Sequence, residues 1–175
     1  MSLIDYIRAG GVIMEILIAM NTVGIALMAT KWFQYWRYSA KKEQHARQIL
    51  ERFEGIGGHD KETVILLVKE LLQAGLKPLE KGMPTIRIIA STATLFGLLG
   101  TVVGVLMAFE SISKTGMGDP SAFAGGISMA LVTTVGGLIV AIIHTVGYNH
   151  LIAYLDDIEA ALEEALLQHL YGEKQ

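Results

Sequence analysis

The chain has 175 residues, of which 52% are hydrophobic, and a mean hydropathy of +0.46. Its formal net charge of −3 is too small to favour nucleic acid as a partner, and the absence of cysteine excludes disulfides, thiol nucleophiles and cysteine-bound metals. The apolar residues are concentrated in three blocks. This distribution predicts an all-α integral membrane protein with three transmembrane helices extended into the cytoplasm. The N-terminus lacks a basic region and an A-x-A cleavage motif, so we expect no removable signal peptide.

The first apolar block covers residues 11–30, and its length matches a hydrocarbon core of roughly 30 Å. Aromatic and basic residues follow it directly, which is typical of a membrane interface. They are Lys31, Trp32, Phe33, Tyr35, Trp36, Arg37 and Tyr38. Glu15 lies about one turn inside the block, and a hydrated helix end accounts for this carboxylate better than a protein contact does.

Residues 39–83 are the basic part of the chain. We expect a helix over residues 61–74, with Asp60 as its N-cap. Gly75, Pro78 and Gly82 are expected to end it. Its predicted apolar face consists of Val64, Leu67, Val68, Leu71 and Leu72.

The charge distribution predicts the orientation of the chain. Lys and Arg are retained on the cytoplasmic side of membranes, which places residues 39–83 in the cytoplasm, the N-terminus outside and the C-terminus inside. The same segment carries no enzyme motif. His45 and His59 are isolated in it, so we expect solvated loop residues rather than metal ligands.

The second and third apolar blocks form a predicted hairpin. They cover residues 86–109 and 125–147 and are joined by a short polar loop at 110–122. Residues 148–175 are predicted to form an amphipathic cytoplasmic helix. Its apolar seam consists of Leu151, Leu155, Ile158, Leu162 and Leu166.

Small residues recur three or four positions apart in both hairpin blocks. Each interior Gly costs a water-soluble helix about 1 kcal/mol relative to Ala, but in a bilayer small residues let helices approach closely. One face of the second block carries Ala93, Gly97, Thr101, Gly104 and Ala108, with Gly100 and Gly104 forming G-x-x-x-G. The matching stripe on the third block is Gly126, Ala130, Thr133 or Thr134, Gly137 and Ala141. Both stripes predict helix packing, and we interpret them as surfaces for assembly.

Two motifs carry a family resemblance. They read GLLGTVVGVLMAF at residues 97–109 and GGISMALVTTVGGLIVAI at residues 125–142, the second followed by Tyr148 and Asn149. Both resemble the MotA/TolQ/ExbB proton-channel family, most closely its ExbB/TolQ branch. MotA proteins are less similar, because they have four membrane helices where this sequence predicts three.

The resemblance implies a function. Such proteins form a homo-oligomeric ring, typically a pentamer, in the bacterial inner membrane around the single transmembrane helices of an ExbD/TolR-like partner. Proton flow then drives motion, and a periplasmic domain of the partner passes force to outer-membrane import or envelope processes. A TonB/TolA-like protein is a further possible partner. Together with the charge distribution, we expect a periplasmic N-terminus and a cytoplasmic C-terminus. The residues show no enzyme motif and no metal-ligand set, so we expect no enzymatic activity, no cofactor and no metal.

Two threonines, Thr101 and Thr134, match the family's pore-facing positions, and the role of Thr133 is left open. Thr101 and Thr134 share a depth to within a few ångströms at 1.5 Å per residue, and Thr133 is an open alternative to Thr134. The resemblance implies that they face the partner's carboxylate, whereas threonines in apolar helices commonly bond back to their own helix. Met129 occupies the position of the branch's glutamate, so the partner is expected to carry the proton chemistry. Partial substitution by Glu15 or Glu110, and a less tightly coupled or altered protein, are the alternatives. His144 lies near the cytoplasmic end, where hydration is the expected state.

Other classes compete with a proton-driven motor. An intramembrane enzyme is disfavoured, because Ser128 and His144 lie sixteen residues apart on one helix, about 24 Å, too far for a dyad. A MotA-like stator subunit and a non-conducting membrane scaffold remain as alternatives.

Overall fold

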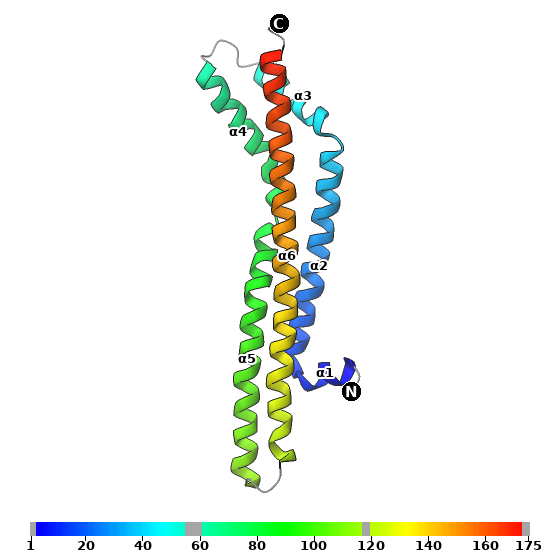
Figure 1. Cartoon of the computed structure of the whole chain (residues 1–175), viewed down its shortest axis with the longest axis vertical. Helices are drawn as coiled ribbons and strands as arrows, with labels where there is room; N and C mark the ends of the chain where they lie inside the picture. The colour runs from blue at the N-terminus through cyan, green and yellow to red at the C-terminus, as the bar shows by residue number, and fades with distance from the viewer. Residues whose placement is uncertain (1–2, 55–60, 117–119, 173–175) are drawn as a thin grey trace. The chain divides into compact units, whose positions relative to one another are not determined.

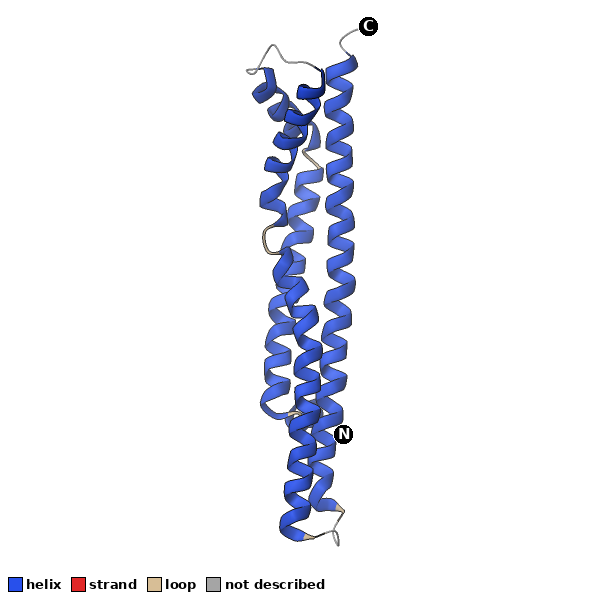
Figure 2. Ribbon diagram, turned by 90° about the vertical axis from the view of Figure 1, so that its left-hand side faces the viewer, coloured by secondary structure: helices blue, strands red, loops and turns tan. Residues whose placement is uncertain are grey.

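The computed structural model describes residues 3–54, 61–116 and 120–172, and every regular element among them is an α-helix. These are α1 (Leu3–Ala9), α2 (Gly11–Ser39), α3 (Lys42–Glu54), α4 (Lys61–Glu80), α5 (Met83–Thr115) and α6 (Ser121–Gly172), as Figures 1 and 2 show. Within the described residues, α2, α5 and α6 each contain a segment long and apolar enough to cross a membrane. An all-α integral membrane protein with three spanning helices is therefore confirmed.

The chain divides into two compact units. The first unit comprises Met1–Leu27 and Pro84–Tyr148, and therefore contains α1, the start of α2, nearly all of α5 and the first half of α6. Apolar residues from three helices form its core, namely Ile13, Leu17, Ile89, Ala93, Val140 and Ala141. The second unit comprises Met28–Met83 and Asn149–Gln175.

Within the first unit, α2 and α6 run in the same direction. A Cβ atom added at Gly11 would lie 3.7 Å from Cε of Met129, and one added at Gly24 would overlap the ring of His144. Higher residue numbers on α2 therefore face higher residue numbers on α6. Gly11 has a φ of +56°, a conformation that glycine adopts without strain, and it allows the turn between α1 and α2. Figure 1 shows α1 lying across the start of α2.

Within the second unit, α6 presents the predicted apolar seam. Leu151, Leu155, Ile158, Leu162 and Leu166 are all buried, at no more than 5% exposure. Lys69 of α4 and Glu163 of α6 lie 3.7 Å apart as an exposed ion pair, worth little because water screens it. The seam is thus covered by other parts of its own unit.

Helix α4 is longer than the sequence pattern predicts. It continues through Gly75 and Pro78 to Glu80, so the expected end at residue 74 is wrong. Leu76 and Leu79 are 3% exposed and continue the buried spacing of Val68 and Leu72, so apolar burial outweighs the helix-breaking tendency of Pro78. Gly82, with a φ of +94°, follows the end of the helix. The predicted N-cap, Asp60, lies outside the described residues.

Lys31 and Tyr35 do not belong to an exposed interface belt. Lys31 is 7% exposed, and its Nζ donates to the Oε1 of Gln34 at 2.9 Å and to the carbonyl of Leu79 at 3.1 Å. The buried Tyr35 hydroxyl donates to the same carbonyl at 3.0 Å. Helix C-termini leave their last carbonyls without partners, so these two side chains cap α4. Trp32 remains 58% exposed, as the sequence predicts for an interface residue.

The hairpin loop is shorter than predicted. Helix α5 continues to Thr115 and α6 begins at Ser121, whereas the sequence pattern predicts a loop over residues 110–122. Lys114 pairs with Glu110 at 2.5 Å, and such pairs four residues apart support a helix.

Candidate functional site

The predicted site residues lie in the hairpin of α5 and α6, within the first unit. A Cβ atom added at Gly104 would lie 2.5 Å from the carbonyl oxygen of Gly126 and 2.7 Å from the nitrogen of Ala130. One added at Gly137 would lie 2.6 Å from the carbonyl oxygen of Ala93. The two backbones are therefore in contact and run antiparallel. The small stripes interpreted above as assembly surfaces face each other within a single chain.

The absence of a side chain at Gly100 makes room for the side chain of Thr133. A Cβ atom added at Gly100 would overlap the side chain of Thr133, which is completely buried. The sequence pattern places Thr101 on the face of α5 that contacts α6, but in the structure Gly100 is the residue in contact with Thr133. Successive helix residues point about 100° apart, so Thr101 lies to one side of the contact.

Thr133 and Thr134 are held by main-chain carbonyls. Thr133 donates to the carbonyl of Met129 at 2.8 Å and that of Ala130 at 3.1 Å. Thr134 donates to the carbonyl of Ala130 at 3.0 Å and, across the hairpin, to that of Gly97 at 3.3 Å. Thr134 thus joins α6 to α5, while Thr133 bonds back to its own helix.

Thr101 is half-buried, and its hydroxyl donates to the carbonyl of Leu98 at 2.5 Å. All three threonines therefore make the backbone contacts that are common for this residue in apolar helices. Of the three, Thr101 and Thr134 keep partial exposure within the chain, whereas Thr133 has none. Their part in proton transfer remains a prediction.

Met129 lies at the α2 side of α6. It is half-buried and packs against the core of the first unit, as do Met20, Phe96 and Val103. The hairpin segments at residues 88–109 and 121–143 contain no Asp, Glu, Lys or Arg. The arrangement can therefore offer hydroxyl and carbonyl oxygens to a proton path, but no carboxylate of its own at mid-depth.

His144 is buried rather than hydrated. It has no exposed surface, its ring lies against Gly24, and its Nδ1 is 2.8 Å from the carbonyl oxygen of Val140. The expectation of a hydrated histidine at a helix end is wrong, because α2 covers this side of α6. Gly24 is the sequence feature that could have indicated this burial, because a side chain at position 24 would overlap the His144 ring.

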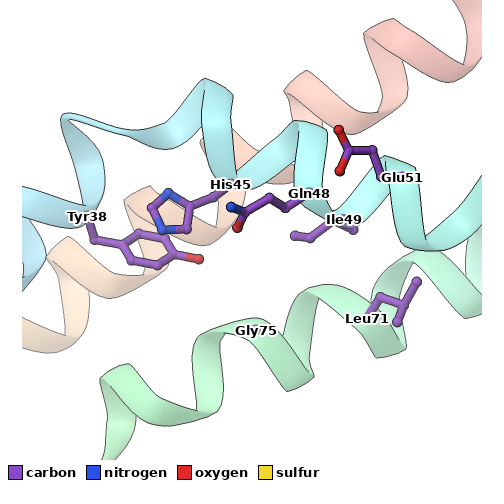
Figure 3. Close-up of a pocket in the computed structure, with 7 residues that line it drawn as sticks. All are labelled: Tyr38, His45, Gln48, Ile49, Glu51, Leu71 and Gly75. Carbon is purple, nitrogen blue, oxygen red and sulfur yellow. The ribbon is translucent and has the colours of Figure 1, made fainter.

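The second unit carries a cleft of about 490 Å³, shown in Figure 3. Its lining consists of Tyr38, His45, Gln48, Ile49, Glu51, Leu71 and Gly75. His45 belongs to α3, is half-buried and stacks on Tyr38 with ring centroids 3.9 Å apart, so it is no solvated loop residue. His59 lies outside the described residues, and those that are described contain no group of three potential metal ligands.

Comparison with known proteins identifies the family of this chain. The model of the MotA/TolQ/ExbB proton channel family matches residues 37–164. The chain belongs to this family. Its residues 37–164 include the whole threonine hairpin, so the motifs that carry the resemblance lie within the matched region.

Members named ExbB are among its relatives. A biopolymer transport protein ExbB of Pseudomonas putida is 34% identical over 76% of this chain and 39% of its own length. One of Aquifex aeolicus is 42% identical over 43% of this chain and 51% of its own length. A putative ExbB homolog of Methanothermobacter thermautotrophicus is 32% identical over 63% of this chain and 39% of its own. The matched parts of this chain thus span about two fifths to one half of these relatives.

Proposed function

We propose that this MotA/TolQ/ExbB family member is the ring-forming subunit of a proton-driven motor in the bacterial inner membrane. Several copies, typically five in this family, enclose the transmembrane helices of an ExbD/TolR-like partner. Proton flow between ring and partner energises outer-membrane transport or envelope processes through this partner, and a TonB/TolA-like protein is a further component of the complex. The chain acts as a channel subunit and not as an enzyme.

The observation that carries the proposal is the uncharged hairpin with hydroxyls on two helices. Thr134 reaches across from α6 to α5, and Thr101 stands partly exposed beside the Gly100 contact. A hydroxyl can both donate and accept a hydrogen bond, so it can orient water beside a carboxylate. Because the hairpin has no carboxylate at mid-depth, the partner supplies the titrating group.

The outer surfaces of the hairpin support a ring in a bilayer. Large apolar side chains cover them, with exposures of 43–65%. These include Leu95, Leu98, Leu99, Val102, Val105, Leu106 and Phe109 on α5, and Leu131, Val135, Leu138, Ile139 and Ile142 on α6. Exposed apolar surface of this extent belongs against lipid or other membrane helices. Since the small stripes are used within the chain, these larger side chains form the surfaces available for neighbouring copies.

The topology proposed with this function puts the N-terminus in the periplasm and residues 39–83 in the cytoplasm. Parallel α2 and α6 and antiparallel α5 are the directions that three successive spans would take. The basic residues of the 39–83 segment support the assignment of the cytoplasmic side.

Proton flux tests the function. Ring and partner are reconstituted in vesicles, and flux is followed with a pH-sensitive dye. Thr101→Val and Thr134→Val remove hydroxyls at nearly constant volume, and we expect flux to fall to the background of protein-free vesicles while the ring stays assembled. Thr22→Val is the matched control, because Thr22 donates to its own helix at the carbonyl of Ile18 at 2.9 Å and lies on α2. Normal flux in both hairpin variants would contradict a proton-path role for these hydroxyls.

Met129→Glu tests which group carries the proton. Met129 packs against the apolar core, so a glutamate there would be desolvated, and a second carboxylate near the partner's would raise one of the two pKa values. We expect lower flux than in the unchanged protein. Equal or higher flux would instead assign this chain a carboxylate-dependent cycle like that of the ExbB/TolQ branch.

A non-conducting scaffold is the alternative that one observation favours. Each of the three threonine hydroxyls already bonds to a main-chain carbonyl. In a scaffold these bonds are the whole role of the threonines, and the unchanged ring and partner would show no flux above background.

A further inference from the structure

Two buried polar atoms of the first unit have no hydrogen-bond partner among the described residues. They are Oδ1 of Asn21 on α2 and Nε2 of His144 on α6. The His144 ring lies against Gly24, which follows Asn21 by three residues on α2. Residues three apart share a helix face, so Asn21 lies on the side of α2 that meets His144, and we assign both unpartnered atoms to this contact. Buried polar atoms without partners are rare, and a pair in one contact calls for a common cause.

The chemistry of the two atoms shows what is missing. Nδ1 of His144 is 2.8 Å from the carbonyl oxygen of Val140, and a carbonyl can only accept, so Nδ1 carries the hydrogen. In the neutral ring Nε2 is then a bare acceptor. Oδ1 of Asn21 is also an acceptor. Two acceptors cannot satisfy each other, so these two atoms need a hydrogen from another group.

We propose that the α2–α6 contact is a binding site for one hydrogen-bond donor, held between Nε2 of His144 and Oδ1 of Asn21. The donor is either a buried water molecule, which can offer a hydrogen to each acceptor, or a second proton on the His144 ring directed at Asn21. Either donor would link α2 to α6 by hydrogen bonds next to Gly24. The site lies apart from the hydroxyls of Thr133 and Thr134, which face α5 or their own helix.

Neighbouring charges do not supply this donor. On α2, no ionisable residue occurs between Leu17 and Met28. The flanking ones are Glu15, which is exposed, and Lys31, whose amine is bonded to Gln34 and Leu79. On α6, the nearest ionisable residue is the half-buried Tyr148, one turn away, followed by the exposed His150. On α5, the described cation near the N-terminal end of the helix is Arg87, which is exposed. The site requires neither a partner protein nor proton conduction.

Nitrogen NMR tests the site. The full-length chain is labelled with ¹⁵N-histidine, placed in lipid bilayers without partner, and the His144 signal is identified by its loss in His144→Leu. We expect either magnetisation transfer from water to Nε2 of a neutral ring, or a ring protonated on both nitrogens, and these outcomes distinguish the two sources. In Asn21→Leu either signature should be lost. A neutral Nε2 without water contact, or one that receives its hydrogen from the Asn21 amide, would overturn the proposal.

Thermal unfolding of the same chain gives an independent measurement. With a shared donor, Asn21→Leu and His144→Leu each lower the midpoint, and the double variant loses less than the sum of the two. If the contact is dry, removing an orphan acceptor should raise the midpoint in each single variant, which refutes the site. Thr22→Val and His150→Gln are the matched controls on the same helices, and both should leave the midpoint unchanged.

Discussion

Gly104→Ala should separate the two helices of the hairpin. The added methyl group would lie 2.5 Å from the carbonyl oxygen of Gly126, about 0.9 Å short of the 3.4 Å at which ordinary van der Waals contact begins. The nitrogen of Ala130, at 2.7 Å, obstructs it as well. Both atoms are backbone, so no side-chain rotation relieves the overlap and α5 must move away from α6. The bond from Thr134 to the Gly97 carbonyl, already 3.3 Å long, would break.

The expected loss of stability follows from two opposed terms. Overpacking of a tight contact costs about 1–3 kcal/mol, whereas replacing Gly by Ala in a helix contributes up to about 1 kcal/mol in the other direction. With the full opposed term the net loss is up to about 2 kcal/mol, which lowers the unfolding midpoint of a chain of this size by up to roughly 8 °C.

Circular dichroism of the full chain in detergent measures the midpoint. Gly125→Ala is the control, because nothing lies within 4 Å of a Cβ atom added there, and its midpoint should be unchanged or slightly higher. A second comparison separates backbone from side-chain obstruction. The three atoms nearest to a Cβ atom added at Gly100 all belong to the Thr133 side chain, so Thr133→Gly should relieve Gly100→Ala, whereas Ala130→Gly should not relieve Gly104→Ala. Equal midpoints for Gly104→Ala and Gly125→Ala would refute close backbone contact in the hairpin.

Two further predictions concern the cap of α4 and the orientation in the membrane. Lys31→Met removes the charged donor to the Leu79 carbonyl and should cost about 1.5–3 kcal/mol in denaturation experiments, whereas the exposed Lys41→Met should cost almost nothing; equal stability of the two variants would rule out the cap. A cysteine at the exposed Ser113 should react with a membrane-impermeant reagent from outside the cell, and one at the exposed Ala40 only after permeabilisation; the reverse labelling would invert the proposed topology.

Much of the architecture can be predicted from the sequence, because it depends on the local pattern of apolar residues. The length of the apolar blocks predicts three spanning helices. The 3.6-residue period predicts the seam of α6, in which Leu162 and Leu166 are fully buried. The same period predicts that glycines line one side of the hairpin, although it does not say whether the covering surface belongs to the same chain or to another copy.

The remaining features depend on which distant segment covers a residue. Neighbouring positions such as Gly100 and Thr101 differ by only 100° around a helix, so only the approach of Thr133 decides that the glycine lies in the contact. Lys31 is buried because the end of α4, 48 residues away, offers it a carbonyl. His144 is buried because Gly24 on another helix makes room for its ring. A polar side chain is hydrated or enclosed according to the partner that the tertiary structure brings to it, and no local pattern contains that partner.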